Sequence, residues 1–138
     1  MVLSTDTWLY LSGAGASAWA AGALVAPKMM IKTIYEPGTP ELIPPFRYFG
    51  VAGAGVAAHS FGMAASKDAN EKTKKAHLKR DAALWLAAGA VTAIHGYRGE
   101  HKKDVAYGVG GMTMGVGALM MFDACRGEKK GSCCGGKK

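Results

Sequence analysis

The chain of 138 residues lacks the short motifs that mark common enzyme classes. It has no Gly-x-Ser-x-Gly nucleophile motif, no phosphate-binding loop and no pair of carboxylates within its uncharged stretches. Its three cysteines, Cys125, Cys133 and Cys134, all lie near the end of the chain, so they do not form a disulfide framework. We therefore expect no enzyme activity and no catalytic residue. We also expect free thiols rather than a disulfide, a soft-metal site or palmitoylated cysteines.

Charge is absent from four long stretches, residues 7–27, 48–66, 82–97 and 105–122. A soluble helix normally mixes polar and apolar residues in every turn, and these stretches do not. About 20 helical residues, each rising about 1.5 Å, cross the roughly 30 Å core of a bilayer. The pattern predicts an all-α integral membrane protein with four transmembrane helices in an antiparallel bundle.

We expect these helices at about residues 7–27, 46–66, 69–97 and 104–123, within one four-span domain over residues 1–138. Residues 124–138 then form a basic, polar C-terminal tail. The connector over residues 28–47 holds four prolines, so we expect it to be a partly buried loop.

The third helix should extend out of the membrane. Asp68 and Glu71 have the spacing of a capping box, which marks a helix start, and nothing breaks the helix before Tyr97. Its first half is densely charged, so we expect it to stand in solvent. We likewise expect His77 and His101 to be solvated.

Small residues spaced four apart predict faces where helices approach closely, as in Gly-x-x-x-Gly pairs of membrane helices. The rows that we expect to pack are Gly50, Ala54, Ala58 and Gly62; Gly13, Ser17 and Ala21; and Gly111 with Gly115.

The chain carries 17 Lys and Arg against 10 Asp and Glu, and they flank the uncharged stretches. This placement favours anionic lipids over nucleic acid as the partner, and we expect no nucleic-acid binding. The residues that we expect at the lipid headgroups are Lys72, Lys74, Lys75, Lys79 and Arg80. The richer basic side includes both termini, which predicts that they lie on the matrix, stromal or cytoplasmic side.

His59 and His95 are the candidate cofactor ligands, because ionisable groups at membrane depth are uncommon. Their positions on antiparallel helices differ in depth by roughly 15 Å, so a haem shared between them is excluded. A single axial bond from His59 to a haem or chlorophyll is one interpretation, and a neutral His59 bonded to a neighbouring helix is the other. Glu100, His101 and Asp104 lie in a connector crowded with basic residues, so we expect no metal site.

The stretch Arg47-Tyr48-Phe49-Gly50 resembles small four-helix DoxX-like membrane proteins. The resemblance covers this motif and the predicted topology, and it implies no function.

Three functions fit these patterns. The first is a non-catalytic accessory subunit of a large energy-transducing complex, with other membrane subunits as partners, bound lipids and no required cofactor. Gly- and Ala-rich helices without a cleavable presequence place it first in the mitochondrial inner membrane, in a respiratory complex or supercomplex. The second is a pigment- or haem-associated subunit of a photosynthetic complex in the thylakoid, with His59 as axial ligand. The third is a small DoxX-like permease or lipid-handling protein.

Overall fold

The computed structural model describes residues 3–35 and 43–126, and this part of the chain is all-α, which confirms the predicted class. The helices are α1 (Thr5–Val25), α2 (Pro27–Ile34), α3 (Ile43–Ala65), α4 (Glu71–Tyr97) and α5 (Lys103–Cys125). The predicted tail lies outside the described residues from position 127 onward.

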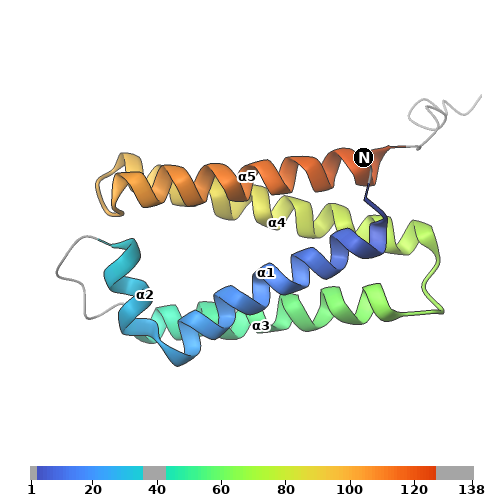
Figure 1. Cartoon of the computed structure of the whole chain (residues 1–138), viewed down its shortest axis with the longest axis horizontal. Helices are drawn as coiled ribbons and strands as arrows, with labels where there is room; N and C mark the ends of the chain where they lie inside the picture. The colour runs from blue at the N-terminus through green and yellow to red at the C-terminus, as the bar shows by residue number, and fades with distance from the viewer. Residues whose placement is uncertain (1–2, 36–42, 127–138) are drawn as a thin grey trace, which may run out of the picture.

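The four long helices form two antiparallel hairpins, α1 with α3 and α4 with α5, which lie along the long axis of the molecule (Figure 1). The start of α1, the end of α3, the start of α4 and the end of α5 gather at one end. We call this the N-terminal end. The helix α2 and the α4–α5 turn lie at the other end, which we call the turn end. Most close contacts fall within each hairpin, and fewer join one hairpin to the other.

A short helix, α2, occupies the first part of the connector, so the loop predicted from residue 28 is wrong there. Pro27 stands at the first helical position, where proline loses no hydrogen bond, and it therefore starts α2 as well as ending α1. The chain bends by 108° between α1 and α2. Ile31 turns inward and packs with Ala23 and Phe46.

The start of α4 also differs from the prediction. Asn70, rather than the predicted Asp68, caps the helix, and its side-chain oxygen accepts a hydrogen bond of 2.8 Å from the Thr73 amide.

One face of the first half of α4 packs into the bundle, so the expectation that this half stands in solvent is wrong for that face. Lys74, His77 and Asp81 are all buried, although the sequence around them is densely charged. Leu78 and Ala82 from the same half join a core cluster with residues of α1, α3 and α5 at the N-terminal end. Polar partners from the other helices offset the cost of burying these groups.

Small residues spaced seven apart line the contact between α4 and α5. Glycine or alanine recurs at these buried positions: Ala82, Gly89 and Gly96 on α4, and Gly110, Gly117 and Ala124 on α5. A methyl group added at Gly89 would stand 2.7 Å from the Gly110 carbonyl oxygen and 2.8 Å from the Met114 amide nitrogen. The two backbones are therefore in direct contact, which only glycine permits at this position.

The predicted rows only partly coincide with this packing. Gly50 and Gly13 are buried against another helix, and Ser17 is half-buried. The remaining members are exposed on the described chain: Ala21, Ala54, Ala58, Gly62, Gly111 and Gly115. A four-residue spacing rotates by about 40° at each step, whereas seven residues return to within about 20° of the same face. The seven-residue rows therefore stay in contact and the four-residue rows turn outward.

Only α5 is by itself long and apolar enough to cross a membrane among the described helices. The bent pair α1 and α2 passes the same test if it is taken as one span. One or two such helices are weak evidence for membrane insertion. The helices α1 and α3 fall short because glycine, alanine and serine are only weakly hydrophobic, and α4 falls short because of its charged first half.

Gly89→Ala should push α4 and α5 apart and lower the free energy of unfolding by about 1–3 kcal/mol, the usual cost of overpacking. The matched control is Gly111→Ala on α5, where the added methyl group meets no atom within 4 Å. We expect the control to be neutral or stabilising by up to about 1 kcal/mol, because alanine favours helix. Denaturant unfolding followed by circular dichroism measures both, and equal effects would contradict the described α4–α5 contact.

Candidate functional site

The carboxyl group of Asp81 lies in the interior, where α1, α3 and α4 meet. Its side chain is fully buried. The Ser12 hydroxyl of α1 donates a hydrogen bond of 3.0 Å to its Oδ2 atom, and the Ser60 hydroxyl oxygen of α3 lies 2.6 Å from the same atom. Asp81 belongs to α4, so this one oxygen atom joins the first hairpin to the second.

The two serines extend this network in different directions. The Trp85 indole Nε1–H donates to the Ser12 hydroxyl oxygen at 3.0 Å, so Ser12 both accepts and donates. The Ser60 hydroxyl oxygen also lies 2.9 Å from the Val56 carbonyl oxygen in the preceding turn of α3. Each serine is almost completely buried, and each therefore depends on these partners for its hydrogen bonds.

The second carboxyl oxygen of Asp81, Oδ1, is buried and accepts no hydrogen bond from the described part of the chain. Nε2 of His77 and a guanidinium nitrogen of Arg80 each lie 3.9 Å from it. These two atoms are 2.8 Å apart, so the guanidinium donates to the imidazole nitrogen. The His77 ring also meets the ring of His59 from α3 edge-on, with a centroid distance of 4.2 Å.

His77 is buried, contrary to the expected solvation. Burial lowers the pKa of His77, and the charge of Arg80 and the proximity of His59 lower it further, while a negative charge on Asp81 would raise it. His77 is therefore neutral at pH 7, which agrees with its acceptance of a hydrogen bond from Arg80.

The N-terminal end holds a second set of polar contacts between the hairpins. The Trp8 indole donates a hydrogen bond of 2.7 Å to Oδ2 of Asp123, joining α1 to α5. Lys74 of α4 pairs with Asp6 of α1 at 2.8 Å. The ammonium group of Lys74 also lies 3.4 Å from the Ala64 carbonyl oxygen. Lys74 is therefore placed inside the bundle and not at the surface where we expected it.

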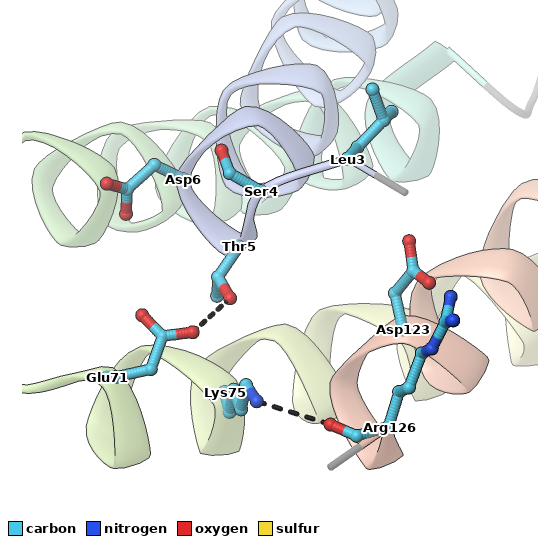
Figure 2. A pocket seen from close by; sticks show the side chains of 8 residues that line it. All are labelled: Leu3, Ser4, Thr5, Asp6, Glu71, Lys75, Asp123 and Arg126. Atoms are coloured by element: carbon cyan, nitrogen blue, oxygen red, sulfur yellow. Dashed lines mark hydrogen bonds between the residues drawn. The ribbon is translucent and has the colours of Figure 1, made fainter. Parts of the chain in front are cut away.

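Beside these contacts lies an open hollow of about 280 Å³ between the start of α1, the start of α4 and the end of α5. Figure 2 shows the Thr5 hydroxyl donating to Glu71 on one side, and the Lys75 ammonium group donating to the Arg126 carbonyl on the other. Acidic and basic side chains both line the hollow, so its chemistry favours neither an anion nor a cation.

The turn end carries a cluster of aromatic and titratable side chains. The His101 ring stacks on His95 at 5.0 Å and meets Tyr35 edge-on at 4.4 Å. A ring nitrogen of His95 hydrogen-bonds to the Glu100 carboxylate. The backbone amide of Lys102 donates to the Ile34 carbonyl at 3.0 Å, which holds the α4–α5 turn against the end of α2.

His101 is buried, so its predicted solvation is also wrong. Neither ring nitrogen has a hydrogen-bond partner among residues 3–35 and 43–126. Burial lowers the pKa of His101, with a further lowering from His95 and an opposing effect of Glu100. The pKa of Tyr35 is raised, first by burial and then by the charge of Glu100.

The two predicted cofactor ligands thus belong to different clusters. His59 is exposed and contacts His77 near the N-terminal end, whereas His95 is half-buried against His101 at the turn end. Among the predicted headgroup residues, Lys72 and Arg80 are exposed, and Lys75 and Lys79 are half-buried. Within residues 3–35 and 43–126, no group of three or more His, Cys, Asp or Glu side chains is placed to hold a metal ion.

The sequence alone does not predict the hydrogen-bond network around Asp81. One signal for it was present, because Ser12 and Ser60 stand within small apolar stretches where a hydroxyl needs a partner. The sequence places Asp81 at the end of a charged run, and that position favoured a solvated residue over a buried one. Comparison of the chain with protein-family models, with curated proteins and with solved structures gives no match.

Ser12→Ala should lower the free energy of unfolding by about 1–3 kcal/mol, because it removes a donor to Asp81 and leaves the Trp85 indole N–H without its acceptor. The matched control is Ser17→Ala on the same helix, at a half-buried position, which should stay within about 0.5 kcal/mol of the parent. Denaturant unfolding of both variants gives the comparison. Equal losses would show that the buried network adds nothing specific.

Stability should also fall as the pH drops through the range in which unfolded histidine takes up protons. The folded pKa of His101 lies below its ordinary value of 6.5, so its stabilising effect is complete above pH 6.5 and is lost as the pH falls below it. His101→Phe keeps a ring against Tyr35 but cannot be protonated. Unfolding curves from pH 7.5 to 5.5 should therefore be flatter for this variant, and a slope identical to that of the parent would exclude His101 as a contributor.

Proposed function

We propose that the chain is an integral membrane protein whose four long helices, α1, α3, α4 and α5, cross the bilayer over their uncharged parts, residues 7–25, 48–65, 82–97 and 105–122. In this proposal it serves as a non-catalytic accessory subunit of a large energy-transducing complex. A mitochondrial inner-membrane respiratory complex or supercomplex is the first candidate.

The observation that carries this proposal is the apolar outer surface of the bundle. Large apolar side chains are exposed along the uncharged stretches, among them Leu11, Phe49, Val91, Met112 and Phe122. Contact with water is unfavourable by about 25 cal/mol for each Å² of such surface, and monomeric soluble proteins rarely expose large patches of it. Lipid chains or neighbouring membrane helices would cover this surface without that cost.

Exposed small residues support partner helices in addition to lipid. Gly62 of α3 and Gly111 and Gly115 of α5 have open space where a side chain would stand, and Ala54 and Ala58 are exposed on α3. Small residues on a membrane helix allow a neighbouring backbone to approach closely. The helices that the structure describes do not pack on these outer rows, so the rows are available to other subunits.

The orientation of the bundle in the membrane rests on the distribution of charge in the sequence. Of the 17 Lys and Arg residues, 11 lie in residues 67–80 and 126–138, and six lie in residues 28–47 and 98–103. Among the described residues, both ends of the bundle expose basic side chains, and both described chain ends lie at the N-terminal end (Figure 1). Basic residues concentrate on the matrix, stromal or cytoplasmic side of membrane proteins and attract anionic lipids. This proposal therefore places the N-terminal end on that side.

A second candidate is a pigment- or haem-associated photosynthetic subunit with His59 as axial ligand. Its supporting observation is that His59 is exposed and that Gly55 and Gly62, four and three residues away, have open space at the Cβ position. A flat macrocycle needs such a surface. An absorbance band of the purified protein that disappears in His59→Ala would favour this candidate over the first.

Gly115→Leu should reduce incorporation into a large assembly several-fold, because the new side chain would hold a partner helix away from α5. The control is Leu119→Ile, which lies one turn further along the same exposed row and keeps its volume. Native gels of mild-detergent membrane extracts, with partners identified by mass spectrometry, measure incorporation. A parent protein that runs only as a free monomer or small homo-oligomer, or that is soluble without detergent, would contradict the proposal.

A further inference from the structure

The hydrogen bonds around Asp81 do not fit an ionised carboxylate well. The Ser60 hydroxyl oxygen lies within hydrogen-bond distance of two acceptors, Oδ2 of Asp81 at 2.6 Å and the Val56 carbonyl oxygen at 2.9 Å. A serine hydroxyl has one proton, so with an ionised Asp81 the two acceptors have to share it in a bifurcated hydrogen bond. Neither of the two short contacts then has a proton of its own.

A proton on Asp81 resolves this conflict. The carboxyl O–H then donates to the Ser60 oxygen, and the Ser60 hydroxyl donates to the Val56 carbonyl, so each short contact has a proton. The Ser12 hydroxyl still donates to Oδ2, where a lone pair remains, at 3.0 Å. No heavy atom has to move.

The unpaired Oδ1 atom also favours a protonated Asp81. An oxygen of a buried carboxylate that lacks a hydrogen-bond donor carries a large desolvation penalty, which is smaller for the carbonyl oxygen of a neutral acid. The guanidinium of Arg80 is 3.9 Å away, beyond hydrogen-bond distance, and its side chain is 52% exposed. Water therefore weakens its attraction for a charged carboxyl group.

We propose that Asp81 is a proton-binding site that the bundle holds as a neutral carboxylic acid between Ser12 and Ser60. The side chains that face it are Ser12 from α1, Ser60 from α3, and His77 and Arg80 from α4. This site depends on the interior of the bundle, so it is independent of the proposed assembly and of what covers the outer surface.

Infrared spectroscopy of the full chain tests the proposal directly, because protonated and ionised carboxyl groups absorb in separate regions. At neutral pH the difference between the parent and Asp81→Asn should contain the band of a protonated carboxyl group, and the band should move to lower frequency in D₂O. Asp123→Asn is the control, because Asp123 is only half-buried and accepts from the Trp8 indole. Its difference spectrum should lack that band.

Ser60→Ala provides a second reading that does not require Asp81→Asn to fold. It removes the oxygen that accepts the carboxyl proton, so the band should move to the higher frequency of a less strongly hydrogen-bonded acid. The proposal is overturned if Asp81→Asn removes only carboxylate bands, or if the protonated band does not respond to Ser60→Ala. Carboxylate bands of Asp81 that shift on addition of Na⁺ would instead show a cation site and would also overturn it.

Discussion

The architecture depends on two hydrogen-bond contacts to one oxygen atom of Asp81, one from the Ser12 hydroxyl and one from the Ser60 hydroxyl. Two helical hairpins that touch each other over little area need a specific interaction to fix how they sit together. The Ser12 and Ser60 hydroxyls, from the two helices of one hairpin, both reach Oδ2 of a residue on the other. A buried polar group is costly unless it is paired, so any sliding of one hairpin past the other would leave these groups unpaired. The network thereby selects one register.

Close approach of the helices at glycine residues inside each hairpin makes that arrangement possible. Gly89 and Gly110 bring α4 and α5 together without intervening side chains, and Gly50 lies against Ala23 and Leu24 of α1. Because little side-chain bulk lies inside each hairpin, the larger apolar side chains turn outward, where they form the surface that we assign to lipid and partner subunits. The buried network and the apolar exterior are thus two results of the same distribution of small residues.

The sequence alone was sufficient for the all-α class, because uncharged stretches of helical length leave few alternatives. It was not sufficient for the choice of helix face. Glycine and alanine are so frequent that rows spaced four and rows spaced seven both occur, and only the three-dimensional contacts show that the seven-residue rows face inward. The sequence does not predict the short helix α2, because Pro27 lies at the end of the expected helix 7–27 and proline suits a helix start equally well.

The candidate site was less predictable than the fold for a different reason. The burial of His77 and Asp81 depends on residues of α1 and α3 that are far away in the sequence. A charged run such as residues 67–81 is normally solvated, and nothing local distinguishes Asp81 from its neighbours. What distinguishes it is the arrival of two serine hydroxyls at the same point, which only the tertiary structure provides.

The most direct test of this account is a double-mutant cycle between Ser60 and Asp81. Unfolding free energies of Ser60→Ala, Asp81→Ala and the combined variant give the interaction between the two side chains, free of their separate effects. The account predicts a favourable coupling of about 1–3 kcal/mol. If the changes in unfolding free energy of the two single variants sum to that of the combined variant within about 0.5 kcal/mol, the two residues do not interact. That result would contradict the proposed link between the hairpins.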